Sequence, residues 1–368
     1  MSPTKLQSLY DEHNQSPWLD NLKRGYLSSG ELERFVERGI RGITSNPSIF
    51  QKAISVGNDY DEQFGALIGK GSSVEDSYWD MVVQDINAAL AILRPVYDSS
   101  DAEDGYVSIE VAPSLARDTE GTTKASADLW HRIDQPNLYV KIPGTAEGLP
   151  AIRSSLAAGI NVNVTLLFSV SRYDEVIEAY LSGLEDRIAA GGSVERVTSV
   201  ASFFVSRVDT EIDRRLEAIG TPEALALRGK SAVANAQLAY GLFLERFSGA
   251  RWDALEAAGA KVQRPLWAST STKNPDYKDT LYVDQLIGPR TVNTMPDQTI
   301  EDFDDHGTLA RTVDADLDGA RAVIDQVKAV GVDIDDVGRV LEEEGVAVFS
   351  KSFDELIDSL SAKASELA

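Results

Sequence analysis

One lysine, Lys141, lies within the otherwise apolar stretch L-Y-V-K-I-P-G-T, residues 138–145. The aliphatic side chains of this stretch alternate with Tyr139 and Lys141, so in a β-strand the lysine lies on the face opposite the aliphatic residues. Pro143 then ends the strand. Such a lysine either extends its amine to water or is buried, where an amine can act as a nucleophile. The pattern alone favours the solvated amine, so a catalytic amine needs support from other residues.

Polar side chains recur near the predicted carboxyl ends of other strands. The full set is Asp20, Asn46, Glu110, Lys141, Asn163, Thr165 and Ser202. Taken singly, most have ordinary explanations, such as a turn residue for Asn46 and a β-branched strand residue for Thr165. Lys141 and Glu110 are the exceptions, because burying a charge in an apolar strand is costly without a role. Together, a lysine, two carboxylates and several hydroxyl and amide groups are the components of Schiff-base carbonyl chemistry.

Strand patterns alternate with helical patterns along the whole chain. We expect about eight strands, near residues 17–20, 40–47, 106–113, 138–143, 160–168, 197–207, 265–274 and 290–296. The intervening helices include residues 29–38 with Ser29 as N-cap, 74–93, 122–133, 231–246 and 353–367. No hairpin signal of the Asn-Gly kind separates the strands, so we expect them to be parallel.

Both a doubly wound sheet and a (β/α)8 barrel fit this alternation. Inward polar residues at the carboxyl ends of the strands favour the barrel, where these ends converge on one pocket. We therefore predict an α/β fold, a single (β/α)8 TIM barrel with additional helices, forming one domain over residues 1–368. The amine of Lys141 is expected to point inward from the fourth strand, within reach of Glu110 and Thr165.

Composition and charge exclude several classes of function. The chain is 43% hydrophobic and 26% charged, which is typical of globular proteins, and it has no apolar run of membrane-spanning length. Its formal net charge of −24 argues against nucleic acids and anionic membranes as partners. A small phosphorylated substrate is still allowed, because one or two local cations suffice to bind a phosphate.

The sequence contains no cysteine, which excludes disulfides, thiol catalysis and thiolate zinc sites. Its three histidines, His13, His131 and His306, have no metal-ligand spacing, so we expect no metal. The absence of cysteine is compatible with a reducing compartment, and the N-terminus has no signal pattern, so we expect a cytoplasmic protein. The sequence does not determine the oligomeric state and is compatible with a homodimer.

Several motifs, in this order, resemble those of the transaldolase family: T-S-N-P-S, S-I-E-V, Y-V-K-I-P-G-T, N-V-N-V-T-L-L-F-S and S-F-F-V-S-R. Trp18-Leu19-Asp20 is similar to the W-L-D branch of that family, and the motifs extend from about residue 18 to 274. The resemblance implies a (β/α)8 enzyme of the pentose phosphate pathway. Such an enzyme transfers a dihydroxyacetone unit from sedoheptulose 7-phosphate or fructose 6-phosphate to glyceraldehyde 3-phosphate or erythrose 4-phosphate. The transfer proceeds through a lysine Schiff base and needs no cofactor.

The resemblance implies catalytic roles for Lys141, Glu110, Asp20 and Thr165, and substrate binding by Asn46, Asn163, Ser202, Phe204, Arg207, Ser271 and Lys273. Lys141 corresponds to the Schiff-base lysine, and Glu110 with Thr165 to the residues that position a catalytic water. The substrate phosphate would be bound by Arg207 and by Ser271 with Lys273. Lys273 stands where the family commonly has arginine. The planar guanidinium, which can bind a phosphate through two hydrogen bonds, is therefore replaced by the single point charge of an ammonium group. Lys273 can also be read as a solvated loop lysine.

Two other functions are alternatives to transfer. The fructose-6-phosphate aldolases resemble transaldolases but carry Gln and Tyr where this chain has Glu110 and Phe204. A barrel that binds sugar phosphates without turnover would be expected to lack a catalytic residue, and every expected residue is present. The sequence therefore favours transfer over both alternatives.

Overall fold

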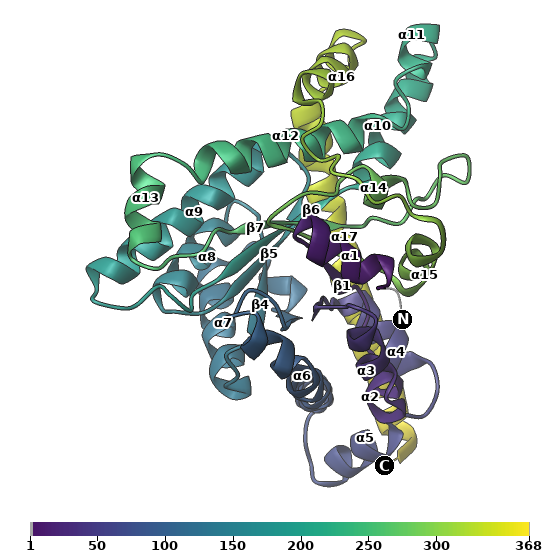
Figure 1. Ribbon diagram of the computed structural model, residues 1–368. Coiled ribbons are helices and arrows are strands. Elements are labelled where there is room, and N and C mark those ends of the chain that lie inside the picture. Colours follow the sequence, from purple (N-terminus) through teal and green to yellow (C-terminus); the bar gives the residue numbers. More distant parts are fainter. Residues whose placement is uncertain (1–2, 368) are drawn as a thin grey trace.

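A computed structural model describes residues 3–367, which include a closed barrel of eight parallel strands (Figure 1). The strands are β1 (Gln15–Leu19), β2 (Gly42–Ile43), β3 (Tyr106–Glu110), β4 (Leu138–Pro143), β5 (Val162–Leu167), β6 (Ser199–Phe204), β7 (Arg264–Ala268) and β8 (Thr291–Met295). Each strand pairs with the next along the chain, and β8 pairs with β1. The predicted (β/α)8 TIM barrel with additional helices is confirmed. Residues 1, 2 and 368 of the predicted domain lie outside the described residues.

Helices connect the strands and surround the barrel (Figure 1). They are α1 (Lys5–His13), α2 (Arg24–Ser29), α3 (Glu31–Glu37), α4 (Pro47–Ser55), α5 (Asp61–Gly69), α6 (Val74–Ser99), the 3-10 helix η1 (Pro113–Leu115), α7 (Thr119–Ile133), α8 (Gly148–Ala157), α9 (Val170–Ala189), α10 (Ser206–Ile219), α11 (Pro222–Leu225), α12 (Ser231–Arg246), α13 (Ala250–Ala257), α14 (Leu281–Asp284), α15 (Asp297–His306), α16 (Leu317–Ala329) and α17 (Ile334–Leu367). Within residues 3–367, no helix is both long and apolar enough to cross a membrane.

The register of the central strands sets the position of Lys141. Its Cα pairs with that of Glu110 on β3 and with that of Asn163 on β5. Residues paired in this way have side chains on the same face of the sheet. The three polar side chains therefore lie side by side on the inner face of the barrel, toward the carboxyl ends of the strands.

A buried ionic cluster closes the opposite end of the barrel. Asp104 is fully buried and lies 3.0 Å from Arg264 Nη2 and 2.7 Å from Arg41 Nε. Its carboxylate also accepts hydrogen bonds from Ser16 Oγ and Trp18 Nε1. Burial by itself raises the pKa of Asp104, but the two guanidiniums outweigh it, so this pKa lies below its ordinary value. These fixed side chains fill the amino-terminal end and leave the carboxyl end for a site.

Two local predictions near the N-terminus were wrong in detail. The predicted helix at residues 29–38 is present as α3, but Gly30, whose φ of +72° favours glycine, separates it from α2, so Ser29 ends α2 instead of capping α3. The second strand is also shorter than predicted. Its expected polar end, Asn46, is the N-cap of α4, because its side chain accepts a hydrogen bond from the Ile49 amide, and Pro47 is the first helical residue.

Three boundaries near the carboxyl half also differ from the prediction. The sixth strand ends at Phe204, and residue 207 lies in the first turn of α10. This helix forms because Val208, Ile212 and Leu216 give it a buried apolar stripe with helical spacing. The seventh strand ends at Ala268, so residues 271–273 lie in a loop. The last helix begins at Ile334, well before Phe353. In Figure 1 it is the yellow helix that passes behind the barrel, and it contacts α10, β5, α6 and α4.

Candidate active site

A cavity of about 780 Å³ lies at the carboxyl ends of the strands. It is lined by every predicted site residue except Glu110 and Asn163, namely Asp20, Asn46, Lys141, Thr165, Ser202, Phe204, Arg207, Ser271 and Lys273. These side chains come from six strands or the segments that follow them, and from α10. The barrel therefore brings together residues that are far apart in the sequence.

The Lys141 side chain is inside the barrel and only 4% exposed. Its Nζ lies 3.1 Å from Glu110 Oε2 and donates a hydrogen bond of 3.2 Å to the Ser45 carbonyl. The ring of Phe349 lies on another side, with its centroid 5.8 Å from Nζ. The amine is thus enclosed at the cavity wall and does not extend to bulk water, which is the second of the two positions considered for it.

Glu110 lies behind Lys141, on the side away from the main cavity. Together with Tyr78 and Phe353 it borders a small neighbouring pocket. Burial raises the pKa of Glu110, and the adjacent Lys141 amine offsets only part of this increase. A carboxyl with a raised pKa is a stronger base than an ordinary glutamate and can exchange a proton with the amine beside it.

A second carboxylate, Asp20, follows β1 and faces the cavity. Its Oδ1 accepts a hydrogen bond of 2.7 Å from Thr44 Oγ1, which fixes the carboxylate orientation. Burial raises the pKa of Asp20, although Lys141, the Thr44 hydroxyl and the more distant Arg207 act in the opposite direction. One carboxyl that lines the cavity, Asp20, and one behind its wall, Glu110, therefore both have raised pKa values near the buried amine of Lys141.

Thr165 and Ser202 contribute hydroxyls to the cavity wall. Thr165 Oγ1 is buried, and none of residues 3–367 gives it a hydrogen-bond partner. Ser202 Oγ donates to Asn163 Oδ1 at 2.7 Å, and Asn163 Nδ2 donates to Ser108 Oγ at 3.0 Å. Asn163 is fully buried and does not line the cavity, so its amide supports Ser202 from within the barrel.

The cavity is locally cationic within a strongly acidic chain. Five Lys or Arg side chains line it against three Asp side chains, whereas the whole chain has a net charge of −24. Arg207 is half-buried, and in the described part of the chain no carboxylate forms an ion pair with it. Burial lowers its pKa from the ordinary arginine value. The exposed Lys273 donates to Ser271 Oγ at 2.7 Å, so these two residues form one polar group near Arg207. Such an arrangement suits a small anion.

One aromatic wall of the cavity and part of its charged rim were not predicted from the sequence. Phe349 of α17 lies in the wall, and its ring centroid is 6.0 Å from Arg207 Cζ. The spacing of four residues from Leu341 through Gly345 to Phe349 was a helical signal that could have placed this residue on a buried face. Lys23 and Lys52 at the rim had no distinguishing signal, because surface lysines are common.

Comparisons with known proteins agree with this geometry. A sequence profile described as transaldolase/fructose-6-phosphate aldolase matches residues 17–360, which include every residue that lines the cavity. The chain is 53% identical over 355 residues to a transaldolase of Thermobifida fusca, covering 96% of each chain. It is 51% identical over 350 residues to a transaldolase of Mycobacterium tuberculosis, covering 94% of each, and 51% identical over 346 residues to one of Mycolicibacterium smegmatis.

Proposed function

The chain belongs to the transaldolase/fructose-6-phosphate aldolase family, and we propose that it transfers a dihydroxyacetone unit between sugar phosphates through a Schiff base on Lys141. The observation that carries the proposal is the enclosed Lys141 amine, 3.1 Å from Glu110, in a locally cationic cavity. An amine in this setting can attack a ketone, and the cations can hold the phosphate of the same molecule. Donors are sedoheptulose 7-phosphate and fructose 6-phosphate, and acceptors are glyceraldehyde 3-phosphate and erythrose 4-phosphate, as in the pentose phosphate pathway.

In the first stage, Lys141 Nζ attacks the C2 carbonyl of the ketose phosphate and forms a carbinolamine. Glu110 accepts the amine proton, for which its raised pKa suits it, and returns a proton to the leaving hydroxyl. A water held by the Thr165 hydroxyl relays the proton, which is consistent with the lack of a protein partner for that hydroxyl. Loss of water then gives the protonated imine.

In the second stage, Asp20 takes the proton of the C4 hydroxyl, and the C3–C4 bond breaks. The electron pair of that bond moves into the protonated imine, and an aldose phosphate leaves. The acceptor aldose phosphate is then attacked by the resulting three-carbon carbanion, and the earlier steps run in reverse. The imine itself accepts the electrons, so these residues need no further electron sink.

Substrate binding is divided among the remaining residues of the cavity. The phosphate is bound by Arg207, Ser271 and Lys273, and the sugar hydroxyls by Asn46 and Ser202, with Asn163 holding Ser202 in place. Phe204 lines the wall between them. The acidic remainder of the surface is unsuited to nucleic acids and anionic membranes. We place the enzyme in the cytoplasm, as one domain over residues 1–368, and a homodimer is compatible with this function.

Replacing Arg207 with alanine is expected to weaken the use of phosphorylated substrates selectively. Charge-assisted hydrogen bonds contribute about 1.5–3 kcal/mol, which corresponds to a loss of roughly 10- to 100-fold in kcat/KM for fructose 6-phosphate. Steady-state kinetics with fructose 6-phosphate and with unphosphorylated fructose separate the effects. Equal losses with both sugars would contradict a phosphate role. Lys273→Ala is the companion variant, and unchanged kinetics would identify Lys273 as a solvated loop lysine.

Transfer and simple aldol cleavage are distinguished by their dependence on the acceptor. Glu110 and Phe204 favour transfer, because the aldolases of the family carry Gln and Tyr at these positions. With fructose 6-phosphate as donor, we expect sustained release of glyceraldehyde 3-phosphate only when erythrose 4-phosphate is present, together with formation of sedoheptulose 7-phosphate. Sustained release at the same rate without acceptor would identify an aldolase instead. Binding of fructose 6-phosphate without either product would identify a non-catalytic barrel.

A further inference from the structure

Strand β5 is irregular at the point where it reaches the cavity. Its register against β6 shifts between Val164 and Leu167, and Leu166 between them has a φ of +61°. A leucine rarely adopts this left-handed conformation, because its Cβ crowds the backbone, so surrounding contacts must hold it there. The preceding residue is Thr165, whose hydroxyl lines the cavity.

The contact that holds Leu166 comes from α17. Leu166 is only 1% exposed, and it packs against the helix at Gly345. A Cβ built on Gly345 would lie 2.9 Å from Leu166 Cδ2 and 3.6 Å from Phe168 Cζ. Real Cβ atoms essentially never approach other atoms so closely, so a larger residue at position 345 would require the Leu166 side chain or the helix to shift.

Thr165 is therefore fixed from two directions. On one side, its carbonyl accepts a hydrogen bond of 2.7 Å from the Gly144 amide, which follows β4. On the other side, Leu166 is held against α17. The peptide between these two attachments sets the direction of the Thr165 hydroxyl, and this hydroxyl has no side-chain or main-chain partner within residues 3–367 that could orient it.

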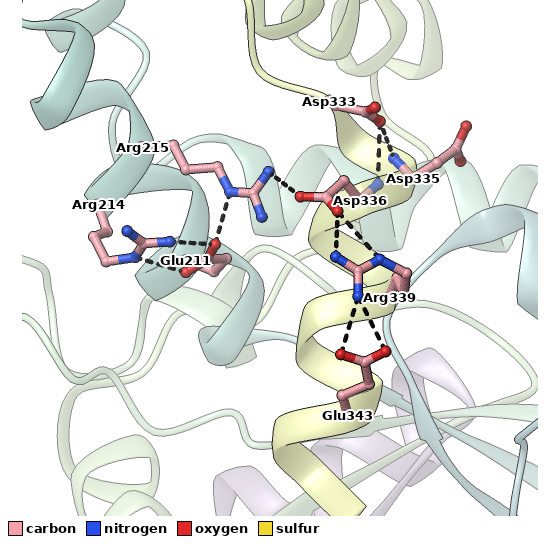
Figure 2. Close-up of polar contacts among 8 residues, drawn as sticks. All are labelled: Glu211, Arg214, Arg215, Asp333, Asp335, Asp336, Arg339 and Glu343. Atoms are coloured by element: carbon pink, nitrogen blue, oxygen red, sulfur yellow. Dashed lines mark hydrogen bonds and ion pairs between the residues drawn. The ribbon is translucent and has the colours of Figure 1, made fainter.

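The helix that supplies Gly345 is itself fixed by ion pairs. Figure 2 shows Arg215 of α10 between Glu211 of the same helix and Asp336 of α17, and its Nη1 lies 2.8 Å from Asp336 Oδ2. On α9, Arg172 lies 3.5 Å from Glu342 of α17. These ion pairs attach α17 to α10 and α9 at Asp336 and Glu342, and neither of them involves Leu166.

We propose that Gly345 of α17 is a positioning residue that, through Leu166, directs the Thr165 hydroxyl toward the reacting carbon at Lys141. This inference rests on the proposed function, because it gives Thr165 the task of holding the water used in imine formation. Helix α17 then has a defined part in catalysis, although Gly345 itself touches no substrate. Misplacing the hydroxyl should slow imine formation and should leave cleavage of the C3–C4 bond largely unaffected.

The test measures two steps separately in single turnovers with fructose 6-phosphate. Quenching with borohydride at successive times gives the rate of imine formation, and release of glyceraldehyde 3-phosphate gives the rate of cleavage. Gly345→Ala, which forces Leu166 to move, is expected to slow imine formation on the order of 10- to 100-fold, the usual effect of a small misplacement. Leu166→Ala, which removes the contact from the other side, is expected to act in the same way.

Combination with Thr165→Val distinguishes positioning from a general structural effect. Once the hydroxyl is absent, Gly345→Ala should cause no further loss, because nothing remains to be misplaced. Gly338→Ala is the matched control on the same helix. Its Cβ would lie 3.1 Å from Ser169 Cβ, away from Thr165, and it should leave both rates unchanged.

Three results would overturn the inference while leaving the proposed function intact. These are an unchanged rate of imine formation in Leu166→Ala, an equal further loss in the Thr165→Val background, or an equal loss in Gly338→Ala. Thermal midpoints of all variants identify a loss that is due to unfolding, and Leu166→Ala decides the question if Gly345→Ala does not fold. Failure of the wild-type enzyme to form any adduct at Lys141 would instead overturn the proposed function.

Discussion

Replacement of Lys141 by methionine is expected to reduce transfer by about 10⁴-fold or more, because the nucleophile that forms the covalent intermediate is lost. Methionine keeps much of the volume of the lysine side chain and leaves the barrel filled. Borohydride reduction in the presence of fructose 6-phosphate, followed by peptide mass analysis, should give an adduct on Lys141 in the wild-type enzyme. No adduct should form in the variant.

The effect of this substitution on the fold is expected to be small, because Glu110 can become neutral. Lys141 currently offsets part of the rise in the pKa of Glu110 that burial causes. Without the amine, this pKa rises further and the carboxyl takes up a proton, which avoids an unpaired buried charge. Lys124→Ala is the matched control, since Lys124 is an exposed lysine on α7 that pairs with Asp128. An adduct on a different lysine that lines the cavity, such as Lys273, would show that the nucleophile has been misassigned.

The strand pattern was sufficient to predict the barrel and the residues on its inner face. Alternation of polar and aliphatic residues gives the face of each side chain directly, and parallel pairing then places Glu110, Lys141 and Asn163 side by side. The carboxyl ends of all strands in a barrel converge. Polar residues at alternate positions, and therefore on the same face, in several strands are thus enough to predict one shared site.

Alternation does not give the depth of a side chain within the barrel. Asn163 and Ser202 have the same inward orientation in the sequence pattern, yet Ser202 lines the cavity and Asn163 lies beneath it, bonded to Ser108. Their difference in height follows from the tilt and stagger of the strands, which depend on how the whole sheet closes. The bulge at Leu166 is another property of the closed sheet that no local pattern revealed.

Contacts between distant segments were the least predictable part of the site. Phe349 reaches the cavity because α17 crosses from α10 to α4, so its position depends on packing between helices far apart in the sequence. Asn46 was placed on the correct side of the barrel, but its side-chain oxygen caps α4, a local hydrogen bond that the strand interpretation did not include. In both cases, helices that follow or cover the strands complete a site that the strands begin.

Replacement of Asp20 by asparagine is expected to slow transfer by about 10²- to 10⁴-fold, which is the contribution of a positioned general base. The step that fails should differ from the one that fails without Lys141. Imine formation does not use Asp20, so the variant should still be trapped on Lys141 by borohydride. The trapped adduct should retain the full fructose 6-phosphate chain, whereas in the wild-type enzyme part of it is the three-carbon fragment. A three-carbon adduct formed by the variant at the wild-type rate would show that another group removes the proton.

The pH dependence of this variant provides a second measurement. Asp20 must be ionised to accept the C4 hydroxyl proton, and burial raises its pKa. In the wild-type enzyme, the rate of cleavage should therefore fall with decreasing pH through a pKa above the ordinary aspartate value of about 4. This limb should be absent from the profile of Asp20→Asn, because asparagine does not titrate. A limb that persists unchanged in the variant would belong to another group, with Glu110 the first candidate.

The raised pKa of Asp20 makes it a better base but lowers the stability of the fold at neutral pH. A carboxyl whose pKa is raised by folding favours the folded state most when it is protonated, and this contribution is lost as the pH rises through the folded-state pKa. Ionised Asp20 is therefore a cost to the wild-type fold at neutral pH. Asparagine removes that cost and keeps an oxygen that can accept the hydrogen bond from Thr44. Thermal denaturation should give Asp20→Asn a midpoint equal to or above that of the wild-type enzyme at neutral pH, with the advantage shrinking toward pH 4. A lower midpoint at neutral pH would mean that the neighbouring cations stabilise the ionised carboxylate more than burial destabilises it, and Asp20 would then be a poorer base than the mechanism requires.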